Sequence, residues 1–216
     1  MADPWYEVVS LVGTNLLLLP TIIIAFHPKV RLYILGLLSI IVMLTSAYYH
    51  LGQTHVFTYE TLEYAQNADH IWAGSLMWYT VFVFLLIPPT VRVSYLLVLL
   101  AMMTNFTGHL VSRLNFYYAF VLFLFIGTFL RFYVFPIRGR RYGLTFIFLG
   151  FFFFLASLPF FYLNDGVGKG NYWWTHSWGW HACAFLGIDF LTFGYVYHVH
   201  FVWDKLLPTL ADKVEY

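Results

Sequence analysis

The chain has 216 residues, of which 61% are hydrophobic, 23% aromatic and only 10% charged, and its mean hydropathy is +0.74. A soluble globular domain carries about 25% charged residues, so this composition excludes a water-covered surface and predicts an integral membrane protein. The formal net charge of +1 gives no basic field for nucleic acid, and the single cysteine, Cys183, excludes an internal disulfide, a cysteine-based zinc site and an iron–sulfur cluster.

Seven stretches almost free of Asp, Glu, Lys and Arg follow one another along the chain. Each is long enough for a membrane-spanning helix, which needs about 20 mainly apolar residues. Runs such as Leu16–Leu19 and Phe151–Phe154 do not alternate in polarity as the strands of a membrane barrel do. The sequence therefore predicts an all-α, multi-pass membrane protein, with one seven-helix transmembrane domain over residues 1–216. The expected helices are 7–26, 32–50, 70–89, 93–112, 115–135, 142–163 and 178–203.

The positive charges are unevenly divided between the two ends of this predicted bundle. Arg113 and Lys169 fall on one side, and the other nine Lys and Arg residues fall on the opposite side. An excess of Lys and Arg marks the cytoplasmic side of a membrane protein. We therefore expect the N-terminus outside or in a lumen and the C-terminus in the cytoplasm.

Several ionisable residues gather at the outer ends of the predicted helices. Such residues inside a membrane are costly and by default indicate function. Imidazole and carboxylate suit zinc, and a catalytic zinc site takes three protein ligands and activates a water at the fourth position. Ligands from the second, third and seventh helices would form such a site, and Ser46, four residues before His50, would reach the water or a substrate oxygen. The residues at the outer ends are His50, Asp69, His70, His109, His176 and His181.

Structural interpretations of the same residues stay open. A single histidine near the membrane surface is commonly a hydrogen-bonding residue, and a pair of histidines facing across two helices would instead suit haem. Asp69 precedes the predicted third helix, and Asp is a favoured N-cap. Asp189, deeper in the seventh helix, is a candidate for a buried structural hydrogen bond or for part of an acyl-chain cavity.

Several short patterns resemble those of the CREST superfamily of seven-helix membrane proteins, and are most similar to the branch of myomaker and the GPI-anchor phospholipase. Ser46 to His50 matches the Ser-x3-His of the family's second helix, and Asp69 resembles the Asp of its third. Further similarity comes from Leu19-Pro20-Thr21, from Thr61 to Tyr64, from Ser75 to Trp78, and from His176-Ser177 followed by His181.

The resemblance implies zinc held by His50, His176 and His181, with Asp69 orienting or activating the water on the metal and Ser46 as an auxiliary polar partner. The family's pair in helix 7 is His-x3-His, whereas this chain has His176-x4-His181. Five residues of α-helix turn through about 500°, which leaves the two side chains roughly 140° apart. Both can face one metal only if the helix begins after His176 or contains a π-bulge, which Gly179 would permit. His109 is an alternative third ligand.

Two functions follow from the resemblance and the residues. The first is zinc-dependent hydrolysis of a lipid ester or amide, as in the ceramidases and phospholipases of the family. The alternative is a non-enzymatic membrane protein with a structural metal or none, either a fusion factor or an accessory subunit of a larger membrane complex. The expected partners are membrane lipids and other membrane protein subunits.

Overall fold

The fold of the described part of the chain is entirely helical. A computed structural model describes residues 5–53, 58–84, 89–106, 126, 141–162 and 173–211, and no strand occurs in these ranges. The predicted all-α class is therefore confirmed. The elements are α1 (Trp5–Thr14), η1 (Asn15–Leu18), α2 (Leu19–Ala25), α3 (Tyr33–Gly52), α4 (Tyr59–Phe84), α5 (Pro89–Phe106), α7 (Arg141–Tyr162), η2 (Trp173–Ala182) and α8 (Cys183–Ala211).

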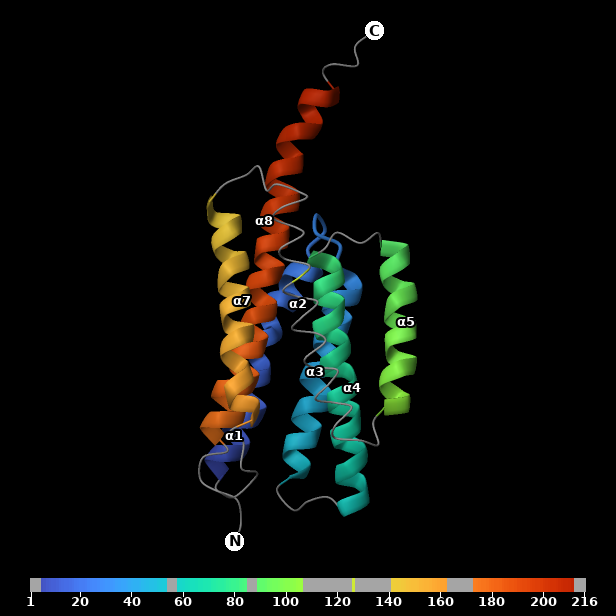
Figure 1. Cartoon of the computed structure of the whole chain (residues 1–216), viewed down its shortest axis with the longest axis vertical. Helices are drawn as coiled ribbons and strands as arrows, with labels where there is room; N and C mark the ends of the chain where they lie inside the picture. Colours follow the sequence, from blue (N-terminus) through green and yellow to red (C-terminus); the bar gives the residue numbers. More distant parts are fainter. Residues whose placement is uncertain are drawn as a thin grey trace.

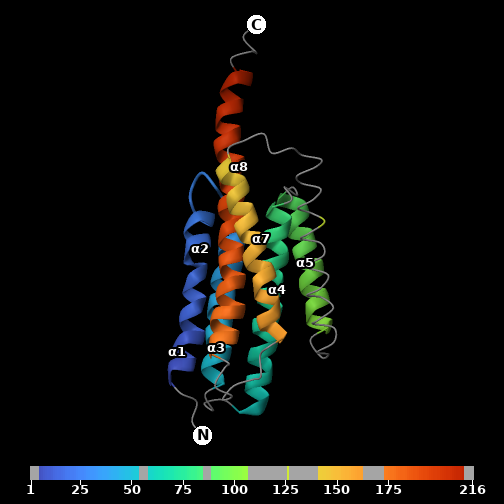
Figure 2. The same cartoon turned by 60° about the vertical axis from the view of Figure 1, so that its left-hand side comes forward.

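The helices lie side by side along one long axis, as Figures 1 and 2 show. The start of α1, the end of α3, the start of α4 and η2 all lie at the end of the bundle that holds the N-terminus. The tightest neighbours are α7 with α8 and α3 with α4, and η2 packs against α1 and α7. This arrangement brings the polar ends of three helices together at one end of the molecule.

Aliphatic side chains form the core between these helices. Leu35 and Val42 of α3, Leu76 of α4, and Ile188 and Leu191 of α8 are almost completely buried in it. Small residues let α7 and α8 approach closely, since a Cβ added at Gly150 would lie 2.8 Å from the Leu191 side chain.

A buried polar contact joins α2 to α8. The Thr21 hydroxyl and the Thr21 backbone N–H both donate to one carboxyl oxygen of Asp189, at 2.5 and 3.1 Å. The first turn of α2 follows the 3₁₀ turn η1 and contains Pro20, and the first N–H groups of a helix have no partner within it. Asp189 provides that partner, so the structure places it in a structural hydrogen bond.

The helix bounds differ from the predicted ones in two places that matter for the site. The helix predicted to begin at residue 70 is α4, which begins at Tyr59 instead. The polar segment before Asp69 consists of residues that tolerate a helix and contains neither Gly nor Pro, so the helix extends through it. The last helical segment begins at Trp173 instead of residue 178 and extends to Ala211. The predicted helix 115–135 falls outside the described residues except for residue 126.

Among the described residues, one helix, Tyr33–Gly52, is long and apolar enough to cross a membrane. Two shorter apolar helical segments are Val9–Ala25 and Thr145–Phe160. By length and composition, this is weak evidence for association with a membrane.

Candidate metal centre

Three histidines from two segments meet at the N-terminal end of the bundle. His50 lies in the last turn of α3, and His176 and His181 lie in η2. One ring nitrogen from each lies within 4.8 Å of those of the other two. The ring centroids are 5.1 Å apart for His50 and His176, 4.9 Å for His50 and His181, and 4.6 Å for His176 and His181. These three residues are close enough to bind one metal ion.

A π-helix solves the spacing problem in the last helical segment. Residues Trp173–Ala182 form π-helix rather than α-helix. Hydrogen bonds in a π-helix run between residues five apart, which is the separation of His176 and His181, so both rings fall on one face. The structure therefore brings the two histidines together across a spacing that an α-helix would not accept, and the segment that does so is ten residues long rather than a single bulge.

Gly179 is central to this local structure. A Cβ at residue 179 would collide with the Phe160 ring of α7, so only glycine lets η2 lie this close to α7. Gly also lacks the preference for α-helix that Ala has. The contact between Gly179 and Phe160 therefore helps to hold the segment in the register that pairs His176 with His181.

We expect Gly179→Ala to weaken metal binding about tenfold or more, because overpacking of about 1–3 kcal/mol is introduced beside the two histidines and about 1.4 kcal/mol corresponds to tenfold in affinity. The measurement is zinc affinity by competition with a chelator. Gly13→Ala is a matched control, since a Cβ there would meet nothing within 4 Å. Equal affinities of Gly179→Ala and the wild type would show that this contact does not set the histidine geometry.

The ring of His50 is oriented by a neighbouring amide. His50 Nδ1 lies 2.8 Å from Gln53 Oε1, and Gln53 Nε2 donates to the Tyr49 hydroxyl at 2.8 Å. An amide oxygen can only accept, so His50 Nδ1 carries the proton and Nε2 has the lone pair. His50 Nε2 and His181 Nδ1 are buried and have no hydrogen-bond partner among the described residues.

These unpartnered nitrogens are the test of whether a metal fits. Leaving a buried polar atom without a partner costs about 1–3 kcal/mol, and native structures rarely tolerate it without a reason such as an ion. Within the part of the chain that the structure describes, the cluster includes no carboxylate and no cysteine inside its mutual 4.8 Å limit, so the donors found there are all imidazoles. Imidazole is the ligand type that suits zinc, copper, iron and nickel.

Asp69 of α4 and Ser46 of α3 form a second polar pair, in which Ser46 lies four residues before His50. Both side chains are buried, with 5% and 1% of their surface exposed, and the Ser46 hydroxyl lies near the Asp69 carboxyl. That contact falls short of the geometry of a direct hydrogen bond. Asp69 lies inside α4 and not at its start, so the alternative that it caps this helix is wrong.

His70 is a fourth histidine near the cluster, to which the sequence assigned no specific role. It lies close enough to His176 and His181 to interact with them electrostatically, and its ring centroid is 6.4 Å from that of Tyr49. The signal in the sequence was its place directly after Asp69. The alternative ligand His109 lies outside the described residues.

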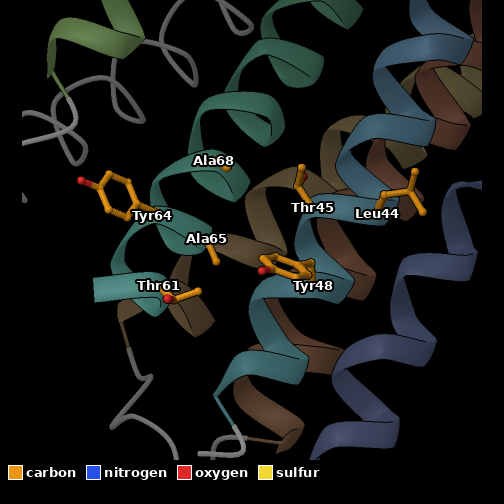
Figure 3. A pocket seen from close by; sticks show the side chains of 7 residues that line it. All are labelled: Leu44, Thr45, Tyr48, Thr61, Tyr64, Ala65 and Ala68. Atoms are coloured by element: carbon orange, nitrogen blue, oxygen red, sulfur yellow. The ribbon is translucent and has the colours of Figure 1, made fainter. Parts of the chain in front are cut away.

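An apolar groove lies between α3 and α4 (Figure 3). Its volume is about 590 Å³. Ala65 and Ala68 lie four residues and one residue before Asp69, and Thr45 directly precedes Ser46, so the groove runs along the helices that carry the second polar pair. The residues that line it are Leu44, Thr45, Tyr48, Thr61, Tyr64, Ala65 and Ala68.

The fold and the cluster together define an all-α protein with three histidines placed to bind a metal ion. The chain belongs to the family described as Protein of unknown function (DUF3522), whose model matches residues 3–182. No curated protein and no solved structure shows significant similarity to it. The matched region includes α1 to η2 and all three histidines, but the description of the family names no activity.

Proposed function

We propose that this chain is a seven-helix membrane protein that binds zinc with His50, His176 and His181 and hydrolyses a lipid ester or amide near the outer membrane surface. The observation that carries the proposal is the convergence of three imidazoles, two of them with unpartnered buried nitrogens. The buried pair of Asp69 and Ser46, the latter one turn before His50 on α3, adds further polar groups. The resemblance to the CREST superfamily supports the same ligand set and the same roles.

Exposed apolar side chains support the membrane part of the proposal. Large apolar residues are exposed on the outward faces of α1 to α3 and of α7, among them Val9, Ile23, Leu44, Phe148 and Phe152. So many exposed large apolar side chains would be costly in water, whereas lipid tails cover them favourably. Most Lys and Arg residues lie at the end of the predicted bundle that is opposite the histidines. This asymmetry supports an outer location for the histidine cluster.

The donor set supports zinc as the metal. Three histidines with an open fourth position are the ligands of catalytic zinc sites. A zinc ion bound there would supply Lewis-acid chemistry to a carbonyl group. The His-x4-His spacing of this chain differs from the His-x3-His of the CREST superfamily. It does not argue against such a site, because η2 is a π-helix.

Asp69 and Ser46 have defined tasks in the proposed reaction. Asp69 accepts a proton from the water that adds to the lipid carbonyl carbon, and it returns that proton to the leaving alcohol or amine as the C–O or C–N bond breaks. Ser46 donates its one hydroxyl hydrogen to a substrate oxygen. The products are a fatty acid and an alcohol or amine, so all atoms of lipid and water are accounted for.

The groove between α3 and α4 supports a lipid as the substrate. Ligand pockets commonly have volumes of about 300–1,000 Å³ and mainly apolar walls, and this groove has about 590 Å³. Its threonine hydroxyls are already engaged, as Thr45 donates to the Ile41 carbonyl and Thr61 pairs with Thr58. The groove therefore offers apolar contact to an acyl chain and few polar groups that would need a partner.

A lipid turnover assay tests the proposed function. Purified protein loaded with zinc is incubated with a lysophospholipid, a phospholipid and a ceramide, and released fatty acid is measured by mass spectrometry. We expect release from at least one substrate class, lost with a chelator and restored by zinc. Stoichiometric zinc without any release would contradict hydrolysis and favour the alternative, a fusion factor or accessory subunit in which the metal joins α3 to η2.

A further inference from the structure

The ligand His50 is one end of a short chain of side-chain hydrogen bonds. Gln53 lies one turn after His50, at the C-terminal cap of α3. Its amide oxygen accepts from His50 Nδ1 and its amide nitrogen donates to the Tyr49 hydroxyl, each over 2.8 Å. The two bonds together hold the Gln53 amide between the rings of Tyr49 and His50, with its oxygen toward His50.

We propose that Gln53 is a positioning residue for the metal centre, which, held by Tyr49, fixes the tautomer and ring angle of His50 so that Nε2 is the ligand atom. The inference rests on the proposed zinc site. A histidine that binds a metal generally donates its other ring N–H to a fixed acceptor, which sets the tautomer and raises the ligand's basicity. Here the acceptor is an amide of the same helix, so the orientation of His50 is set before any metal arrives.

The packing around His50 supports this role. His50 is completely buried and Tyr49 is 7% exposed, and their ring centroids lie 4.9 Å apart. Without Gln53, the buried Nδ1 would lack its acceptor, and the proton could equally reside on Nε2, where it would block metal binding. The tautomer that leaves Nε2 free is the one that the cluster geometry needs, because this nitrogen has no partner among the described residues.

Gln53→Ala tests the proposal through zinc affinity, measured by chelator competition in the purified full chain. We expect a loss of about 10- to 100-fold, the usual effect of removing such a partner. Gln53→Glu supplies a stronger acceptor and is expected to keep or exceed wild-type affinity. Rescue by Glu but not by Ala would distinguish positioning from a general effect on folding, which would lower both.

A second variant covers the case in which Gln53→Ala does not fold. Tyr49→Phe removes only the hydroxyl that orients the Gln53 amide, and we expect a smaller loss of zinc affinity in the same direction. Tyr33→Phe is the matched control, since Tyr33 is exposed and lies at the opposite end of α3 from His50, and it should bind zinc as the wild type does. Wild-type affinity in both Gln53→Ala and Tyr49→Phe, with zinc bound by the wild type, would overturn the inference and leave the proposed function standing. A wild type that binds no zinc would overturn both.

Discussion

His181→Ala is expected to abolish stoichiometric zinc binding. His181 is 6% exposed and lies within 4.8 Å of both other histidines through its ring nitrogen, so alanine leaves two ligands and an apolar gap where the third would be. The measurement is metal content per chain after removal of loosely bound ions. We expect about one zinc in the wild type, because one ligand cluster holds one ion, and none in the variant.

The same prediction applies to His50→Ala, which removes the ligand from α3 instead of η2. His27→Ala is the matched control, because His27 is exposed and its ring accepts from the Lys29 backbone N–H. Added zinc should raise the melting temperature of the wild type and of His27→Ala, since a ligand of the folded state stabilises it. It should leave the melting temperatures of His50→Ala and His181→Ala unchanged. Full zinc content in His181→Ala would contradict the ligand assignment.

Asp69→Asn is expected to lower lipid turnover about 10²- to 10⁴-fold, the usual contribution of a general base. Asparagine has nearly the same shape and keeps the contact with Ser46, but it cannot accept a proton from water. Asp69 lies outside the mutual 4.8 Å limit of the histidine cluster, so zinc content should stay at the wild-type level. The expected result is therefore a metal-loaded protein without activity.

A second buried carboxyl provides the control for this variant. Asp189 is 4% exposed and accepts from Thr21, and its asparagine variant keeps an oxygen for those two donors. Asp189→Asn should retain both zinc and most of the turnover. Normal turnover in Asp69→Asn would remove Asp69 from the reaction, whereas loss of zinc in that variant would instead make it a ligand.

The helical class and the three clustered histidines were within reach of the sequence. Charge-poor runs indicate helices, and polar residues that recur at the ends of such runs indicate a shared site. That argument gathered six ionisable residues at one end of the bundle, and the resemblance to the CREST superfamily then implied His50, His176 and His181 as the ligands. Their mutual 4.8 Å limit comes from the structure, while the zinc, the membrane crossing count and the roles of Asp69 and Ser46 stay predictions.

Other features depended on information that hydropathy does not contain. The early start of α4 was missed because the segment from Tyr59 to Asp69 is too polar to count as a span, although it is a good helix former. The π-helix is supported by a tertiary contact between Gly179 and Phe160, which the sequence does not reveal. The sequence alone shows only that a π-helical segment is one way for His176 and His181 to face the same metal. Gln53 was missed although its place three residues after His50 is the spacing of a helical side-chain pair.

The metal content of the purified wild-type protein tests the central claim most directly. Elemental analysis of protein prepared without added metal, and again after incubation with zinc and removal of the excess, gives the identity and number of bound ions. The account predicts about one zinc per chain that stays bound after the excess is removed, as expected for three imidazole ligands. No bound metal under either condition would contradict the zinc site and the hydrolase together, and would leave the three histidines as hydrogen-bonding residues between α3 and η2.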